Sequence, residues 1–327
     1  HYNYIMFKIK RYNNSHKTQW NQFVYSGNNG TIFHLRTFIN YHPKARFTDH
    51  SLLIKKKGKL FSVLPAAEIK IDQKAYLVSH PGTTVGSFVV PENLSIADAI
   101  QLAKDLVYYA REKDFFGIRI TLPPNLYQDR VSNYMDFAFF NQGFDYLKRE
   151  VTSILFLENS IEKTLEKFRP SHKRGVKKAQ QKGVQVRRTD DFDCFYKILK
   201  NNLNIRHGVN PTHTLKELKL LNKLFPEEIS LFAAYLDKIM IAGVVNFRIN
   251  ENIVLAFYIS HSKEYSDFRS LNLLFATVFD WAIKSKFKIY DFGIFTVNGE
   301  PNMGLGRFKE NFGSSGVFRD TIELVIK

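Results

Sequence analysis

The chain has 327 residues and a formal net charge of +16, with 44% hydrophobic and 15% aromatic residues. This composition supplies enough apolar surface for two folded cores and excludes an intrinsically disordered chain. The single cysteine, Cys194, excludes an intrachain disulfide framework and favours a reducing compartment, so we expect a cytoplasmic protein. No apolar run reaches the ~18 residues of a transmembrane segment. The positive charge favours a polyanionic partner: nucleic acid, a nucleotide-linked substrate or an anionic membrane surface contacted peripherally.

The first half of the chain predicts a mixed series of strands and helices. The Lys57-Gly58 pair predicts a turn between strands at residues 51–56 and 59–71. Ser95 is a suitable N-cap for a helix that ends near Lys113, because a continuous apolar face begins at Ile96. The other elements are a strand near 5–9, a helix near 20–25, strands at 75–79 and 117–122, a helix ending at 141 and a strand at 151–157.

The second half repeats this order of elements. A strand, a turn at Asp237-Lys238 and a second strand occupy residues 229–249. A strand at 253–260, a helix at 271–286 and a strand at 289–294 follow, and the terminal GVFRDTIELVIK corresponds to the strand that closes the first half. The segment YLVSH at 76–80 also corresponds to FYISH at 257–261. The sequence therefore predicts two copies of one α/β unit.

A basic segment, residues 160–188, separates the two copies. Pro170 begins and Gly183 ends a predicted helix with almost no apolar face, so packing in a core does not account for it. Four cations fall at positions i, i+1, i+4 and i+5 and therefore gather on one side. They are Lys173, Arg174, Lys177 and Lys178. A solvated helix is one interpretation, but the lack of carboxylate neighbours favours an anionic partner.

Residues 288–313 combine a predicted buried strand with a predicted glycine-rich loop and a short basic helix. Asn298-Gly299 interrupts regular structure after the strand. Gly304 and Gly306 would let the backbone approach a ligand, and the following helix would present Arg307 and Lys309. A surface loop with solvated charges is the alternative interpretation. Residues 291–293 read DFG, but the other kinase motifs are missing, so the pattern does not indicate a kinase.

Five motifs carry a resemblance to a known family. In chain order they read FRPSHKRGVKKAQQKGV, RHGVNP, AGVVNF, YDFG and GLGRFKENFG. This series resembles the FemABX-like branch of the GNAT acyltransferase superfamily, whose peptidoglycan-bridge members are aminoacyltransferases. The match covers the second half of the chain with specific motifs, whereas the first half matches in the order of its elements and turns.

The resemblance implies an α/β (α+β) fold with two tandem GNAT-like domains, at residues 1–150 and 151–327. Each domain would hold a mixed, mostly antiparallel sheet flanked by helices. The implied function is transfer of an acyl group to an amino group of a cell-envelope saccharide or peptidoglycan-type precursor. An aminoacyltransferase that uses aminoacyl-tRNA is the first alternative. A nucleic-acid-binding protein without enzymatic activity, using the positive surface and the aromatic side chains for stacking, is the second.

Two departures from the family pattern leave the donor open. The long helical hairpin arm that helps peptidoglycan-bridge members engage charged tRNA has no counterpart in the second half. The R-x-x-G-x-G/A loop that holds the CoA pyrophosphate is also missing, because HSKEYSDFRSLNLL follows the strand at 253–260. We prefer acyl-CoA over aminoacyl-tRNA as the donor by a small margin.

The resemblance also suggests roles for individual residues. Lys309, beside Phe308, corresponds to the family lysine at the transfer site and would stabilise the oxyanion or the leaving group. Asp291 at the strand end is a candidate general base, although such a carboxylate often bonds neighbouring backbone. Arg206 and His207, expected in a loop before Pro211, are candidate phosphate contacts. The ten histidines are scattered without a metal-binding motif, so we expect no metal cofactor.

Overall fold

The computed structural model describes residues 7–207 and 210–326, with the side chains of 204–207 left undescribed. Two compact units divide the chain. Unit 1 comprises His1–Glu150 together with Phe318–Lys327, and unit 2 comprises Val151–Val317. The first division lies at the expected position. The last ten residues differ from expectation, because they belong to unit 1 although they follow unit 2 in the chain.

Unit 1 contains two sheets. A small antiparallel sheet has the order β1-β3-β4, and the larger sheet has the order β2-β5-β6-β7-β16. Pro65 separates β4 from β5, and these strands join different sheets, so the single strand expected at 59–71 is wrong. Proline lacks the N–H that a continuing ladder would need. The strands are β1 (Lys8–Arg11), β2 (Thr48–Asp49), β3 (Leu52–Lys56), β4 (Lys59–Leu64), β5 (Ala66–Ile71), β6 (Lys74–Ser79), β7 (Gly117–Thr121) and β16 (Ser315–Val325).

The helices of unit 1 follow the predicted order. Ser95 caps α3 by accepting from the Asp98 amide, as its sequence predicts, and the apolar face of α3 joins α4 in the unit 1 core. Lys57 and Gly58 both have positive φ angles, which gives the two-residue turn expected between β3 and β4. The helices are α1 (Lys17–Ser26), α2 (Arg36–Ile39), α3 (Ile96–Glu112) and α4 (Tyr134–Asn141).

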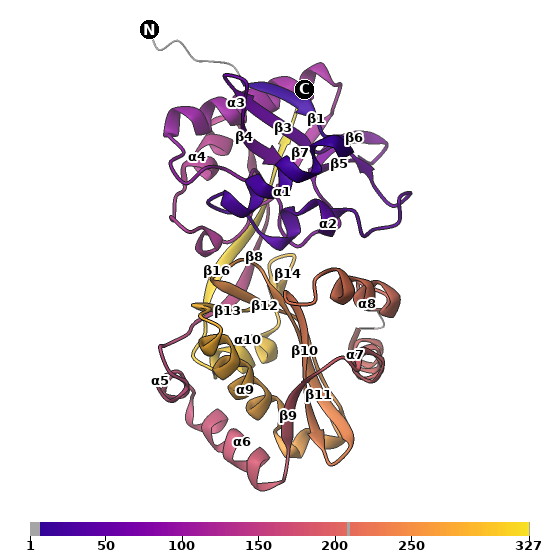
Figure 1. Ribbon diagram of the computed structural model, residues 1–327, viewed down its shortest axis with the longest axis vertical. Coiled ribbons are helices and arrows are strands. Elements are labelled where there is room, and N and C mark those ends of the chain that lie inside the picture. Colours follow the sequence, from indigo (N-terminus) through magenta and orange to yellow (C-terminus); the bar gives the residue numbers. More distant parts are fainter. Residues whose placement is uncertain (1–6, 208–209, 327) are drawn as a thin grey trace. The chain divides into compact units, whose positions relative to one another are not determined.

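Unit 2 is built on one mixed sheet with the order β8-β13-β12-β11-β10-β9. Strands β10 and β11 are buried along nearly their whole length, as is typical of a sheet covered on both faces. Accordingly, α7 and α8 lie on one side of this sheet and α9 and α10 on the other (Figure 1). The strands are β8 (Asp145–Phe156), β9 (Gln185–Thr189), β10 (Ile229–Leu236), β11 (Ile239–Arg248), β12 (Ile253–His261) and β13 (Ile289–Ile294). The helices are α5 (Ile161–Glu166), α6 (Pro170–Gln181), α7 (Phe192–His207), α8 (Leu215–Leu224), α9 (Ser270–Lys284) and α10 (Met303–Glu310).

The internal repeat is visible in the strand pairing. In unit 1, β6 and β7 are parallel, with Tyr76 opposite Gly117. In unit 2, β12 and β13 are parallel, with Ile253 opposite Ile289. Each parallel pair is linked by one helix, α3 in unit 1 and α9 in unit 2.

The strands that close the two copies are exchanged. Strand β8 follows α4 in the chain but pairs with β13 of unit 2, and β16 follows α10 but pairs with β7 of unit 1. The terminal segment therefore follows the second copy in the chain, as expected. It does not close the sheet of that copy, because it pairs with a strand of unit 1.

Candidate functional site

The C-terminal end of β13 is the first part of the site. The parallel pairing of β12 with β13 stops at Leu255 and Asp291, although both strands continue. Gly293 then has a φ of 77°, which favours glycine. Asp291 is fully buried, and its Oδ1 accepts from the Gly293 amide at 2.7 Å and from the Thr152 hydroxyl. The carboxylate thus holds the turn at the strand end, and its general-base role stays a prediction.

Lys309 on α10 reaches the same turn. Its Nζ donates to the carbonyl oxygens of Gly293 at 2.7 Å and Ile294 at 2.9 Å, and the residue is only 2% exposed. The alternative interpretation of Lys309 as a solvated charge is therefore wrong, because the lysine lies on the buried face of the helix, whereas its role in transfer stays a prediction. The Lys309 ammonium and the Asp291 carboxylate therefore bond to main-chain groups of the same turn.

The glycines before Lys309 lie in a helix rather than in a loop. Asn298 and Gly299, with φ angles of 53° and 80°, form a tight hairpin turn between β14 (Thr296–Val297) and β15 (Glu300–Pro301). Asn302 then caps α10, so the predicted loop ends there. Gly304 and Gly306 consequently lie within α10: Gly304 is exposed, and Gly306 packs against the Phe295 ring. Arg307 is exposed, as predicted.

Phe308 has a packing role in the structure. Its ring lies against those of His172 and Phe312, and its carbonyl oxygen lies 3.2 Å from His172 Nε2. Burial and the nearby Arg269 guanidinium lower the pKa of His172 to about 4. The neutral imidazole therefore ties α6 to the backbone of α10, one residue before Lys309.

Helix α6 differs from its prediction. Pro170 begins it as expected, but His172, Gly175, Val176 and Ala179 form a buried face, so the helix does pack in the core of unit 2. The opposite side carries four exposed cations, which we call the basic face of α6. It consists of Lys173, Arg174, Lys177 and Lys178. Among the described residues, none of these four makes an ion pair within 4.0 Å.

The N-terminus of α9 lies against α6 and was missed in the sequence. A Cβ built on Gly175 would lie 2.7 Å from Cγ of Asn272, so the two helices touch there. Arg269 precedes α9 with a φ of 56° and provides no side-chain cap. The Nδ2 group of Asn272 is buried without a hydrogen-bond partner in the described structure. The N-terminus of α9 and the buried Asn272 amide thus lie against the buried face of α6, on the side of that helix opposite the basic face.

Arg206 and His207 lie at the end of α7 rather than in the expected loop. Their side chains lie outside the described residues, so their phosphate-contact role stays a prediction.

In unit 1, α4 takes the place that α10 takes in unit 2, and its sequence YMDFAFFN contains no lysine. This agrees with placing the chemistry in the second copy.

The comparisons with known proteins define the class. Residues 166–310 match the family model for the acetyltransferase (GNAT) domain, a range that begins before α6 and ends one residue after Lys309. The chain therefore carries a GNAT acetyltransferase domain, and the prediction of an acyltransferase enzyme is confirmed. No curated protein matches the sequence.

Solved structures with the same fold cover nearly the whole chain. FemX superposes with a TM-score of 0.74 at 14% identity, over 98% of this chain and 97% of that one. L-PGS from Bacillus licheniformis gives 0.60 at 10% identity, over 95% and 92%. A tandem GNAT protein from the clavulanic acid biosynthesis pathway gives 0.55 at 11% identity, over 97% and 98%. The expected fold of two tandem GNAT-like domains and the resemblance to the FemABX-like branch are thus confirmed.

Within residues 7–207 and 210–326, no group of three or more His, Cys, Asp or Glu side chains is arranged to hold a metal ion. None of the helices described in those ranges has the length and hydropathy needed to cross a membrane.

Proposed function

We propose that this protein transfers an acyl group from acyl-CoA to an amino group of a cell-envelope saccharide or peptidoglycan-type precursor. The observation that carries the proposal is the position of α6, which touches the N-terminus of α9 through Gly175 and the backbone of α10 through His172. Helix α6 therefore joins the N-terminus of α9, where backbone amides would favour the donor phosphates, to the helix that carries Lys309, within the matched GNAT domain.

The donor phosphates would lie at the α9 N-terminus. The backbone amides of a helix N-terminus favour an anion, and here the missing side-chain cap leaves Asn272 and Arg269 as nearby donors. The four charges of the basic face lie on the opposite side of α6 from Gly175 and would attract the anionic donor at longer range. This arrangement replaces the glycine-rich pyrophosphate loop that the sequence lacks.

Acyl transfer would take place at the end of β13. The acceptor amine attacks the donor carbonyl carbon, an N–C bond forms and the thioester C–S bond breaks, and the proton lost by the amine passes to the leaving thiolate, so that CoA leaves as the thiol. The negative charge that develops on the carbonyl oxygen is stabilised by positive charge nearby. Lys309 supplies that charge at the Gly293–Ile294 turn, and Asp291 keeps the turn in place through Gly293 and Thr152.

An aminoacyl-tRNA donor is the second candidate, and the FemX-like fold favours it. The same N-terminus of α9 would then contact the acceptor end of the tRNA. We prefer acyl-CoA because the two longest described helices of unit 2, α7 with 16 residues and α9 with 15, pack on the sheet rather than extend as an arm.

The test of the donor site replaces the basic face of α6 by alanine at all four positions. We expect the KM for acyl-CoA, or the Kd for CoA, to rise at least tenfold, and the wild-type value to rise with salt concentration because phosphate contacts are screened. The matched control removes four exposed cations elsewhere in unit 2. They are Lys200, Lys216, Lys223 and Lys238. Equal donor binding by the two quadruple variants would show that the basic face is merely solvated.

A further inference from the structure

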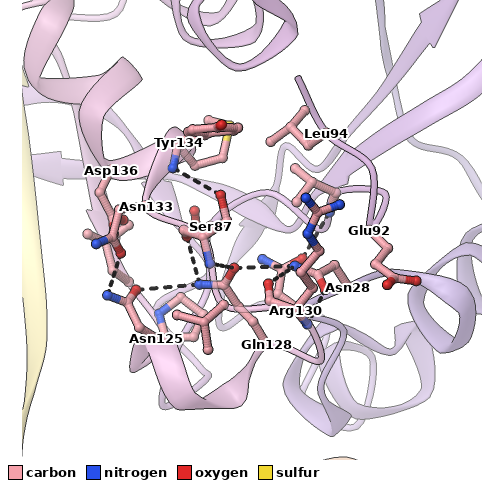
Figure 2. Close-up of a pocket in the computed structure, with 17 residues that line it drawn as sticks. Asn28, Ser87, Glu92, Leu94, Asn125, Gln128, Arg130, Asn133, Tyr134 and Asp136 are labelled. Carbon is pink, nitrogen blue, oxygen red and sulfur yellow. Dashed lines mark hydrogen bonds between the residues drawn. The ribbon is translucent and has the colours of Figure 1, made fainter. Parts of the chain in front are cut away.

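A second site is suggested by a cavity within unit 1. Its volume is about 220 Å³, and its walls come from the segment after α1, the segment 87–94 and the loop between β7 and α4 (Figure 2). Drug-sized ligands occupy sites of about 300–1,000 Å³, so this cavity suits a single sugar ring or amino-acid residue. None of its lining residues belongs to the candidate transfer site in unit 2.

Most of the amide groups in the wall are used to hold the loop rigid. Asn28 accepts from the Arg130 amide at 2.8 Å and donates to the Arg130 carbonyl at 2.9 Å. Gln128 accepts from the Ser132 amide and donates to its carbonyl, and Asn125 donates to the Asn133 side chain at 2.6 Å. Figure 2 shows these bonds as a network along one side of the cavity. The cavity is therefore preformed.

Of the polar side chains in the wall that make no hydrogen bond in the described part of the chain, Ser87 and Asp136 are the two that are not exposed. Ser87 is 3% exposed and has a φ of 74°, a strained conformation for serine, and its hydroxyl makes no hydrogen bond in the described part of the chain. The Asp136 carboxylate, in the first turn of α4, likewise has no hydrogen-bond or ion-pair partner among the described residues. A ligand would therefore find one buried hydroxyl and one half-buried carboxylate not engaged by the protein, in addition to the exposed side chains of Glu92, Arg130 and Tyr134.

The charge around Asp136 favours a cation. Burial, and secondly the Asp320 carboxylate, raise the pKa of Asp136 to about 6. Asp320 on β16 is itself paired with Arg149, and the other charged side chains in the wall are Glu92 and Arg130, both exposed. A positively charged ligand group would relieve the repulsion between Asp136 and Asp320, whereas a phosphate would add to it.

We infer that this cavity binds a primary ammonium group on a small polar body, an amino sugar or an amino-acid residue, with Asp136 pairing with the ammonium and Ser87 bonding the body. This goes beyond the proposed function, because binding here needs neither a donor nor Lys309. An amino sugar and an amino-acid residue share the ammonium group and differ in the rest of the molecule that carries it.

The test is calorimetric titration of the full chain, without a donor, at pH 7. D-glucosamine and L-alaninamide are each compared with their N-acetyl forms, which keep the body but lose the charge. We expect at least one amine to bind at least tenfold more tightly than its N-acetyl form, and the tighter of the two identifies the body. Equal binding of the free and acetylated forms, or no binding of either amine, would overturn the inference.

Three variants locate the binding in the cavity. Asp136→Asn should weaken amine binding at least tenfold, and Asp114→Asn, an exposed aspartate at a φ of 56° that asparagine tolerates, should leave it unchanged. Ser87→Gly relieves the positive φ, so it should fold well and still bind more weakly. Wild-type affinity should also fall between pH 7 and 5 as Asp136 takes up a proton. Unchanged affinity in both Asp136→Asn and Ser87→Gly would place the amine elsewhere.

Discussion

Replacement of Lys309 by methionine tests the interpretation of the β13 turn most sharply. Methionine keeps an unbranched apolar stem and loses the ammonium that donates to Gly293 and Ile294. Hydrogen bonds from a charged donor contribute about 1.5–3 kcal/mol each, so the two lost bonds amount to roughly 3–6 kcal/mol. The desolvation cost of the buried ammonium disappears as well, and we expect a net loss of about 2–4 kcal/mol in the free energy of unfolding.

That loss should leave the protein folded, because domains are typically stable by about 5–15 kcal/mol. Urea denaturation followed by circular dichroism measures it. Lys284→Met is the control: this lysine is exposed and pairs with Asp280 one helical turn away, so its removal should cost under about 0.5 kcal/mol. An unchanged urea midpoint for Lys309→Met would refute the buried hydrogen bonds.

The catalytic part of the prediction is measured separately, on the folded variant. Loss of one oxyanion-stabilising donor typically lowers kcat by about 10² to 10³, and we expect a fall of that size with a nearly unchanged KM for the donor. A folded Lys309→Met variant with kcat within about threefold of wild type would assign Lys309 to structure alone.

Three further predictions concern stability. Burial lowers the pKa of three histidines, to about 4 in His34, about 3 in His80 and about 4 in His172. As pH falls, these histidines take up protons in the unfolded chain before they do so in the folded protein. Their contribution to the free energy of unfolding, which is fully present above pH 6.5, should therefore be lost from pH 6.5 to 4 in urea titrations; a rise in stability over this range would contradict this. The raised pKa of Asp136 has the opposite effect, because this carboxyl takes up its proton in the folded protein first and so stabilises the fold as pH falls. The Asp136→Asn variant should therefore lose stability more steeply over the same pH range. Gly175→Ala should lower Tm despite an improvement of about 1 kcal/mol in helix propensity, because its Cβ would meet Asn272; a higher Tm would show that the contact relaxes. Thr152→Val removes the hydroxyl that bonds the buried Asp291 and should cost about 1–3 kcal/mol; unchanged stability would mean that Asp291 needs no such donor.

Local sequence rules account for the parts of the fold that depend on neighbouring residues. The Ser95 cap, the Lys57-Gly58 turn and strand β13 follow from capping, turn and strand preferences, and each was predicted within a few residues. The exchange of β8 and β16 does not follow from them. The pairing of β8 with β13 and of β16 with β7 joins residues far apart in the chain, which local preferences do not determine.

The missed parts of the site have weaker signals. The buried face of α6 does recur at helical spacing, at 172, 175, 176 and 179, but only Val176 and Ala179 among its members are apolar, and both are small. The burial of Lys309 has a similar signal, because Gly306, Lys309 and Phe312 are spaced by three and all are buried. A lysine in the middle of such a stripe indicates an internal partner, here two carbonyl groups at the end of β13.

The most direct measurement of the central claim is the mass change on the acceptor. Purified protein is offered acetyl-CoA and, separately, charged tRNA, with a panel of nucleotide-linked amino sugars and muropeptide precursors, and the products are read by mass spectrometry. We expect an acetyl increment on the amino group of at least one acceptor, and we expect the Lys309→Met variant to lose it. An amino-acid increment from charged tRNA would instead show that the donor is aminoacyl-tRNA. No increment from either donor, together with tight binding of RNA or DNA, would contradict acyl transfer and indicate a nucleic-acid-binding protein.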